Sequence, residues 1–373
     1  MSKGRLPDKT SKPAPRAPSI AALRVKIDRI DRELVARINE RAKLAHQIGK
    51  IKDANGQRCY DPVREEEVLA KVIELSRGPL SNSALRNVFR ELISGSRALE
   101  RALRVAYLGP EYSYSHLAAI HRFGQSVELV PVASISAVFE EVNQGHAQYG
   151  LVPLENSTDG RVTDTLDMFT RLPVQISGEV QLRIHHYLLG RCDRSEVQEV
   201  YSKPQALSQC RNWLSKHLPN ARAIDVTSTS TAAQLAHDKP GAAAVASLNA
   251  GMHYGLSVLA ENIEDVQGNL TRFAVISEQS GDRSGSDKTS LMFEIAHKPG
   301  SLADAMNIFK RARLNLTWIE SFPIARPEGG YMFFVELEGH QKDSRVRKAC
   351  EALEKKCLRM VILGSYARSP IVE

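Results

Sequence analysis

The stretch Arg104-Val105-Ala106-Tyr107-Leu108-Gly109-Pro110 marks an abrupt change in the character of the chain. Its first five residues have the composition of a short β-strand, and Gly109-Pro110 is a turn signal that ends it. From here to about residue 277, short apolar strands alternate with helical stretches, which is typical of α/β layering. Further strands are predicted over residues 149–153, 197–201, 242–246 and 272–276.

The residues before this stretch, 19–103, have a helical pattern throughout. Ser19 can cap a long first helix, and Asn55-Gly56 ends it. Two further helices are predicted, over about 61–77 and 82–103, and the first of these starts where Asp61 can cap and Pro62 suits the first turn. The first helix has apolar residues at spacings of three and four: Leu23, Ile27, Ile30, Leu34, Ile38, Leu44 and Ile48.

After the α/β segment, which we assign to residues 104–279, the polar run 280–287 is rich in Ser and Gly and is predicted to be a linker. Residues 288–367 then alternate between strand and helix in the order βαββαβ, which is a ferredoxin-like layout. The predicted elements are strand 289–296, helix 301–312, strands 315–322 and 331–338, helix 343–355 and strand 359–364.

Length and composition limit the class of protein. A chain of 373 residues is expected to form two or three domains, and no apolar run is long enough to cross a bilayer. The five cysteines are scattered, with no CxxC pair, so free thiols in a reducing cytoplasm are expected, without a metal site or other cofactor.

The net charge of +7 does not indicate nucleic-acid binding. Residues 1–18 contribute +4 of this charge and contain four prolines, so we predict a disordered basic tail. This tail lacks amphipathic periodicity, which disfavours an organellar transit peptide. A cytoplasmic protein that binds neither nucleic acid nor membrane is the simplest interpretation.

The first helix contains three cations, of which two share a face and the third does not. Arg41 and Lys52 are eleven residues apart, almost three helical turns, and therefore share a face. Arg24 lies seventeen residues before Arg41 and points well away from it. Arg24 can serve the same site only if a second copy of the helix crosses over.

The second and third helices also place polar residues together. Asp61, Arg64 and Glu65 share one face, as do Ser96 and Glu100. From pattern alone, solvated faces of an antiparallel helical bundle explain these charges better than a site does.

A family resemblance changes that interpretation. The helical segment is similar to the all-helical chorismate mutases, in which two protomers interlace their long first helices. The similarity covers nearly all of residues 19–103 and rests on Leu23-Arg24-x-x-Ile27-Asp28-x-x-Asp31, Asn39-Glu40-Arg41-x-x-Leu44-Ala45, Ile48-Gly49-x-x-Lys52 and Asp61-x-x-Arg64-Glu65.

The resemblance implies a role for each cation. A Claisen rearrangement needs no nucleophile, only a substrate held in a compact conformer and charge stabilised at the breaking ether oxygen. Arg24 and Arg41 would hold the two carboxylates of chorismate, with Arg64 nearby, and Lys52 would donate to the ether oxygen.

The remaining polar residues of this segment would complete the chorismate site by the same resemblance. Asp61 and Glu65 would hold the substrate hydroxyl, and Ser96 would lie near a carboxylate. Glu100 takes the place of a glutamine found in some members as a second donor to the ether oxygen. Because a glutamate donates only when protonated, we predict a mutase activity that falls as the pH rises.

The α/β segment resembles the prephenate dehydratases, whose two-lobed fold is like that of periplasmic ligand-binding proteins. The resemblance covers essentially all of residues 104–278. It is carried by Val105–Glu111 with Ser115-His116, Val152-Pro153-Leu154-Glu155-Asn156-Ser157 with Gly160, Ser202-x-Pro204-Gln205-Ala206-Leu207-x-Gln209-Cys210, and Asn269-x-Thr271-Arg272-Phe273.

The dehydratase reaction expels a ring hydroxyl together with the ring carboxylate as CO₂. Thr271 resembles the family's essential threonine and is predicted to assist the leaving hydroxyl. Arg272 would be an anion partner and Phe273 a wall, although Arg272 can also be explained as a structural ion pair. Other predicted prephenate-binding residues are Glu155, Asn156 and Ser157, and Thr229, Ser230 and Thr231 before a helix.

Two departures lie in the first loop of this segment. Tyr112 stands where a glycine is usual, and Tyr114 where a phenylalanine is usual. They leave arogenate open as an alternative substrate. The nearby His116 is interpreted as a packed or capping residue.

The last segment resembles the ACT domain, in which phenylalanine binds between two copies. Matching pieces are Lys288–Leu291, Pro299-Gly300-Ser301-Leu302 and Glu320-Ser321-Phe322-Pro323. The turn formed by Pro299, Gly300, Ser301 and Leu302 would offer backbone amides to the carboxylate of the effector, and Glu320 or carbonyls near Ser321 would meet its ammonium. Ala303, and Phe322 in place of arginine, depart from the pattern and imply altered feedback. A purely structural dimerisation domain is the alternative.

Together these resemblances predict a multidomain, dimeric, bifunctional enzyme of phenylalanine biosynthesis. It would convert chorismate to prephenate and prephenate to phenylpyruvate, with phenylalanine as effector. One rival is a dehydratase whose helical segment only dimerises. The other is a ligand-binding regulator without catalysis, which the Thr271-Arg272-Phe273 triplet and the full set of cations disfavour.

Overall fold

The computed structural model describes residues 19–56, 60–100, 102–324 and 330–372, so the predicted tail lies outside the described residues. The chain divides into two compact units, residues 1–58 and 59–373. Within the described ranges, no helix has both the length and the apolar character needed to span a membrane.

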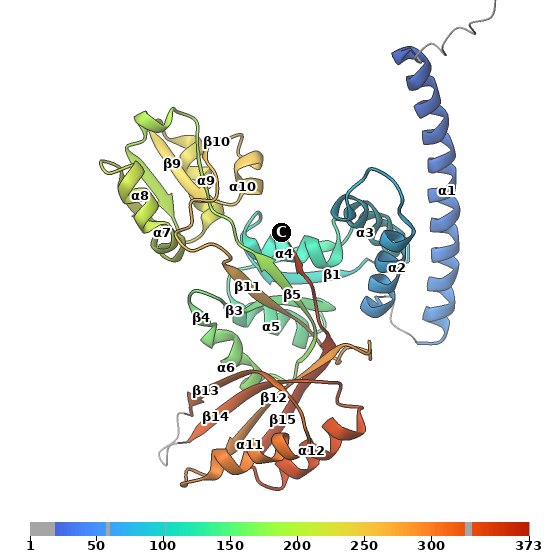
Figure 1. The fold of residues 1–373 in the computed structure, drawn as a ribbon, viewed down its shortest axis with the longest axis vertical. Coiled ribbons are helices and arrows are strands. Elements are labelled where there is room, and N and C mark those ends of the chain that lie inside the picture. The colour runs from blue at the N-terminus through green and yellow to red at the C-terminus, as the bar shows by residue number, and fades with distance from the viewer. Residues whose placement is uncertain (1–18, 57–59, 101, 325–329, 373) are drawn as a thin grey trace, which may run out of the picture. The chain divides into compact units, whose positions relative to one another are not determined.

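The first unit is the long helix α1 (Ile20–Ala54), drawn in blue in Figure 1. Ser19 caps it as predicted, since its hydroxyl accepts from the Ala22 N–H at 3.2 Å, and the helix ends before Gly56, whose φ is +63°. At about 1.5 Å per residue, a helix of this length spans roughly 50 Å. Apolar residues along it are 43–61% exposed: Leu23, Ile27, Ile30, Leu34, Leu44, Ile48 and Ile51.

The second unit opens with α2 (Pro62–Leu75) and α3 (Asn82–Ala98), whose N-caps are Asp61 and Ser81. The prediction that the third helix runs to about residue 103 is wrong by several residues. Leu103 is buried, and its carbonyl accepts from the Glu128 N–H of the neighbouring sheet. This tertiary contact takes Leu103 out of the helix.

A mixed sheet forms the first lobe of the α/β segment, in the strand order β16-β5-β11-β3-β1-β2, with β4 beside β3. β1 runs parallel to β2 and β3, whereas β11 is antiparallel to β3 and β5. The elements are β1 (Arg104–Leu108), α4 (Tyr114–Phe123), β2 (Glu128–Val132), α5 (Ile135–Asn143), β3 (Tyr149–Asn156), β4 (Gly160–Arg161), α6 (Thr163–Arg171), β5 (Gln175–Arg183), β11 (Leu270–Ser277) and β16 (Ile371–Val372).

The second lobe is a smaller sheet in the order β10-β6-β9-β7-β8. Residues 184–186 and 261–269 connect it to the first lobe, which confirms the predicted two-lobed α/β arrangement (Figure 1). Its elements are β6 (Tyr187–Gly190), η1 (Arg194–Glu196), β7 (Glu199–Ser202), α7 (Pro204–Gln209), α8 (Arg211–His217), β8 (Arg222–Asp225), α9 (Thr229–Asp238), β9 (Ala242–Ala246), α10 (Leu248–His253) and β10 (Ser257–Ala260).

The C-terminal domain, β12 to β15, confirms the predicted βαββαβ order. Its antiparallel sheet has the strand order β13-β14-β12-β15. The elements are β12 (Asp287–Ile295), α11 (Ser301–Arg311), β13 (Leu316–Pro323), β14 (Tyr331–Glu338), α12 (Ser344–Glu354) and β15 (Arg359–Ala367).

The sheet of the C-terminal domain is buried on both faces. Leu291, Phe293 and Val335 pack with residues of α11 and α12. Met292 and Phe334, which alternate with them, join the core of the first lobe around Phe169 and Ile176. Since these residues share one core, the C-terminal domain is fixed against the lobe that carries β3, β5 and β11.

Candidate functional site

A cavity of about 920 Å³ lies between the two lobes. The first lobe contributes Asn156, Thr271 and Phe273 to its wall, and the second contributes Gln209 and Thr229. A concave site with polar groups from two lobes and from their connecting segments has the character of a small-molecule site.

Thr271 is held in this cavity by the neighbouring strand. It lies opposite Asn156 in the β11–β3 ladder, and the Asn156 amide donates to Thr271 Oγ1 at 2.8 Å. The same amide donates to Asn269 Oδ1 at 3.0 Å, and Asn156 is 8% exposed. Because Thr271 Oγ1 accepts here, its own O–H remains available to donate to a group in the cavity.

The β11–β3 ladder has a β-bulge directly after Thr271 and Arg272. Arg272 lies opposite Glu155, whereas Phe273 lies opposite Pro153, so Leu154 is the extra residue on β3. Because of this shift, Pro153 and Asn156 both line the cavity, beside their ladder partners Phe273 and Thr271. Phe273, which the resemblance implies to be a wall, is 2% exposed and lines the cavity.

Arg272 points to the opposite face of β11 and is bound by three carboxylates. It donates to Glu155 at 2.9 Å, to Glu179 at 3.3 Å and to both oxygens of Glu336 at 2.6 and 2.8 Å. Burial lowers the pKa of this guanidinium, but Glu336 and Glu179 raise it by more, so the net shift is upward. Neither Arg272 nor Glu155 is among the described residues that line the cavity. This placement favours the interpretation of Arg272 as a structural ion pair over that of a substrate-anion partner.

The predicted helix-start residues divide between the cavity and the fold. Ser228 is the N-cap of α9 and accepts from the Thr231 N–H at 2.9 Å. Thr229 lines the cavity together with Ser228, whereas Ser230 is 2% exposed and is not among the described lining residues. Ser157 stabilises the ladder by accepting from the Leu270 N–H at 2.9 Å.

Gln209 links the two lobes, although the sequence assigned it no role. Its amide donates to Thr158 at 2.7 Å and to Asp159 at 2.9 Å, and its carbonyl accepts from Asn269 at 3.0 Å. The same carbonyl lies 2.8 Å from His186 Nε2. Burial lowers the pKa of His186, while the bond to Gln209 opposes that shift.

Sequence reasoning missed two cations that lie on the wall of this cavity. They are Arg161, on β4, and Lys203, just before α7, and they are the Lys and Arg side chains among the described lining residues. Arg161 also donates to Glu320 of β13 at 2.7 Å, so it connects the cavity to the C-terminal domain. Arg161 directly follows the Gly160 of a quoted motif, which was a signal for its place.

The backbone conformation of Tyr112 is one that favours glycine. Its φ is +63°, a conformation that glycine adopts at little cost. The Tyr112 ring stacks on His253 of the second lobe, with centroids 3.8 Å apart. Its N–H donates to His116 Nδ1 at 2.9 Å, and His116 is buried, which agrees with a packed role for that histidine.

The residues predicted to bind chorismate are distributed over both units. Arg24, Arg41 and Lys52 lie on α1 in the first unit. The second unit holds the others: Asp61, Arg64, Glu65, Ser96 and Glu100.

Within the second unit, Arg97 is the residue that sequence reasoning missed. It is 4% exposed and donates to Glu65 at 2.5 Å and to the Phe123 carbonyl. Burial raises the pKa of Glu65, and Arg97 opposes this shift. The neighbouring Ser96 hydroxyl donates to the Leu92 carbonyl at 2.6 Å. Arg64 forms an exposed pair with Glu67 at 2.7 Å.

The residues predicted to bind phenylalanine lie at two places in the C-terminal domain. Gly300, with φ +86°, is the N-cap of α11, so Pro299 to Leu302 form the turn that starts this helix. Glu320 and Ser321 lie on β13, at the edge of the sheet. Phe322 packs against the core shared with the first lobe, where an arginine would need a partner.

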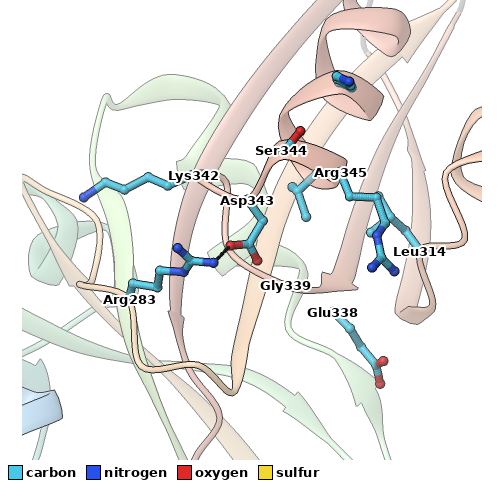
Figure 2. Close-up of a pocket in the computed structure, with 10 residues that line it drawn as sticks. Arg283, Leu314, Glu338, Gly339, Lys342, Asp343, Ser344 and Arg345 are labelled. Atoms are coloured by element: carbon cyan, nitrogen blue, oxygen red, sulfur yellow. Dashed lines mark ion pairs between the residues drawn. The ribbon is translucent and has the colours of Figure 1, made fainter.

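Figure 2 shows a second cavity, of about 760 Å³, at the start of α12. Arg283, which pairs with Asp343, and Glu338 contribute to its wall. Its cations are mixed with carboxylates, and it contains none of the residues predicted to bind phenylalanine. Its other basic residues are Lys342, Arg345 and Lys348.

Comparisons with known proteins agree with both resemblances. A family model described as prephenate dehydratase matches residues 105–281, and one described as chorismate mutase type II matches residues 23–101. The bifunctional chorismate mutase/prephenate dehydratase of Aquifex aeolicus is 43% identical, over 94% of this chain and 98% of its own. That of Stutzerimonas stutzeri is 40% identical, over 95% and 99%. The crystal structure of prephenate dehydratase from Arthrobacter aurescens in complex with L-Phe has a TM-score of 0.66 and 32% identity, over 72% of this chain and 92% of that one.

Proposed function

This chain belongs to the family of bifunctional chorismate mutase/prephenate dehydratases, and we propose that it carries out the dehydratase reaction in the cavity between its two lobes. Its activities are the rearrangement of chorismate to prephenate and the conversion of prephenate to phenylpyruvate. The observation that supports the location is Thr271, which faces the cavity with its O–H free to donate beside the Asn156 amide.

In this proposal Thr271 donates to the ring hydroxyl of prephenate as it leaves. The electrons of the breaking bond between the ring and its carboxylate then form the aromatic ring, and CO₂ departs. Phe273 packs against the ring. Prephenate has two carboxylates, and the cavity offers them Arg161, Lys203 and the amides at the start of α9, where Ser228 is the cap.

Thr271→Val tests this assignment, because valine keeps the shape of threonine and removes only its hydroxyl. We expect kcat for prephenate to fall by about 10²–10⁴-fold, the range for a lost proton donor. Mutase activity of the same sample is the control for folding. A variant with wild-type kcat on prephenate would remove Thr271 from the mechanism. Arogenate as a second substrate in the same assay decides the substrate preference that Tyr112 and Tyr114 leave open.

For the mutase reaction we propose the residues and roles that the family resemblance implies. In this proposal Arg24 and Arg41 hold the carboxylates of chorismate with Arg64 nearby, and Lys52 and Glu100 face the ether oxygen. Asp61 and Glu65 hold the hydroxyl, with Ser96 near a carboxylate. The rearrangement proceeds because this site holds the substrate compactly and stabilises charge on the oxygen.

We propose that a second copy of the chain completes this site, so that the enzyme is a homodimer or a dimer-based oligomer. Arg24 and Arg41 face different directions on α1, and the apolar residues along this helix are exposed at the spacing of a helix–helix contact. An isologous pairing of two α1 helices covers these residues and supplies Arg24 from the partner.

Complementation tests the shared site. Arg24→Ala and Lys52→Met each abolish mutase activity when all copies carry the substitution. Mixing and refolding the two variants creates mixed dimers in which one site has both native residues, and mutase activity returns in part. If the mixture stays inactive while mixed dimers form, Arg24 and Lys52 act within one copy.

The C-terminal domain is proposed to be an ACT domain that senses phenylalanine in a cytoplasmic enzyme. The Arthrobacter aurescens relative was crystallised with L-Phe, and the start of α11 at Gly300 has no side-chain cap, which leaves room for a carboxylate there. Glu320 supplies a carboxylate for the ammonium. Isothermal titration of the full chain with L-Phe and with D-Phe tests this, and heat with the L-isomer alone is expected.

A further inference from the structure

Strand β11 separates the proposed dehydratase site from the C-terminal domain. Thr271 and Phe273 point into the cavity, while Arg272 between them points to the other side. On β3 the pattern repeats, since Asn156 bonds Thr271 and its neighbour Glu155 bonds Arg272. Two adjacent cross-strand pairs therefore face opposite ways, one toward substrate and one toward the C-terminal domain.

The outer pair belongs to a buried cluster of charges. Glu336 of β14 is 0% exposed and Glu179 of β5 is 2% exposed, and both accept from Arg272. Lys288 of β12 donates to Glu179 at 3.0 Å and lies 3.8 Å from Glu336. The Tyr366 hydroxyl of β15 donates to Glu336 at 3.1 Å.

Water cannot take the place of Arg272 at Glu179 and Glu336, because these two carboxylates are closed off from solvent. A buried charge that loses its partner is costly, so Arg272 and Glu336 have to move together. Arg272 is also constrained from β13, where the Trp318 ring lies 5.5 Å from its guanidinium. Any displacement of β13 and β14 is therefore transmitted to Arg272, and a peptide bond joins Arg272 to Thr271.

We propose that Arg272 is a positioning residue for Thr271, and that Glu336 of the C-terminal domain sets its position. The C-terminal domain thereby controls the dehydratase step through the Arg272–Glu336 contact. This rests on the proposed role of Thr271. A ligand that shifts β13 or β14 alters the direction of the Thr271 O–H without entering the cavity.

Glu336→Gln in the full chain tests the proposal, because it keeps the size of the side chain and removes its charge. Mispositioning of a reacting group by about 1 Å can cost 100-fold, so we expect kcat for prephenate to fall by about 10- to 100-fold. KM changes little, since Glu336 lies outside the cavity. Mutase activity of the same sample stays as in the wild type.

The matched control is Glu338→Gln, two residues along the same strand. Glu338 forms an ion pair with Arg368 at 2.6 Å and is much more exposed. It does not contact Arg272 in the described contacts, so its kcat is expected to equal that of the wild type. Tyr366→Phe removes one hydrogen bond from Glu336 and is the milder second variant, with a smaller fall of kcat, should Glu336→Gln not fold.

A double-mutant cycle separates positioning from mere stability. Arg272→Lys keeps the charge but loses the two-pronged contact, so it lowers kcat in the same way. The double variant Arg272→Lys with Glu336→Gln is expected to be no slower than the slower single variant, because both break one link. If the kcat losses of the two single variants multiply in the double variant, the proposal is wrong.

The two hypotheses fail differently. If Thr271→Val is inactive but Glu336→Gln and Tyr366→Phe keep the wild-type kcat, the positioning proposal is wrong and the proposed site stands. If Thr271→Val is active, the proposed site itself is wrong. Inhibition by L-Phe provides a further readout, and in Glu336→Gln the residual activity is expected to be insensitive to it.

Discussion

Replacing Arg97 by methionine removes a buried cation between α2, α3 and the end of α4. Its side chain is 5% exposed and bonds Glu65, while its guanidinium lies 4.8 Å from the Tyr60 ring. Removing one partner of a buried ion pair costs about 3–5 kcal/mol. The lost cation–π contact adds about 0.5–2 kcal/mol. Apolar contacts of methionine offset part of this, so we expect the free energy of unfolding to fall by about 3 kcal/mol.

The loss also depends on pH, with a sign that the structure fixes. Burial raises the pKa of Glu65 in the folded state, and Arg97 opposes this shift. Without Arg97, Glu65 holds its proton more tightly when folded than when unfolded. A neutral Glu65 needs no counter-charge, so the deficit of Arg97→Met shrinks as the pH falls through that pKa.

Differential scanning calorimetry of the full chain measures both effects. A deficit of about 3 kcal/mol lowers the transition temperature by about 4–5 °C, because the unit that holds Arg97 spans residues 59–373 and its entropy of unfolding is about 2.1 cal/mol/K per residue. Arg171→Met is the control, since Arg171 forms an exposed pair with Asp167 and is expected to change stability by less than about 1 kcal/mol. An Arg97→Met transition at the wild-type temperature, or a deficit that grows in acid, would contradict this role of Arg97.

Three further predictions concern activity. Arg161→Gln removes a cation from the cavity wall and is expected to raise KM for prephenate by about three- to tenfold with kcat less affected; an unchanged KM excludes a contact with substrate. Glycine adopts the φ of +63° at little cost, so Tyr112→Gly removes the stack with His253 without straining the backbone. The variant therefore measures how much this contact between the lobes contributes to substrate binding. An aromatic pair contributes about 0.5–1.5 kcal/mol, which predicts a KM rise of at most about tenfold in steady-state assays. Glu100→Gln supplies a donor that needs no proton, so mutase activity that falls with rising pH in the wild type is expected to become flat; a profile that is already flat in the wild type contradicts this role.

Local patterns predicted much of the fold. The cap at Ser19, the end of α1 before Gly56 and the βαββαβ order follow from turn chemistry and apolar spacing, which act over a few residues. The end of α3 was mispredicted because Leu103 is recruited by a strand partner, Glu128, that lies far along the chain. Pattern reasoning has no access to such a partner.

Site residues that belong to a sequence motif could be predicted, whereas contacts between strands far apart in the sequence could not. Thr271 and Asn156 come from two motifs that the ladder brings together. The environment of Arg272 depends on β14 lying behind β11, which no local signal indicates. Arg161 meets Glu320 for the same reason, because the fold joins residues 159 positions apart.

The two activities and the role of Thr271 are tested together when chorismate is added to purified protein and chorismate, prephenate and phenylpyruvate are followed over time, with Thr271→Ala beside the wild type. We expect the wild type to form phenylpyruvate and Thr271→Ala to accumulate prephenate at the wild-type rate of chorismate loss. If the wild type converts prephenate but leaves chorismate untouched, the helical segment is a scaffold. If Thr271→Ala still forms phenylpyruvate at the wild-type rate, the dehydratase site described for the cavity is contradicted.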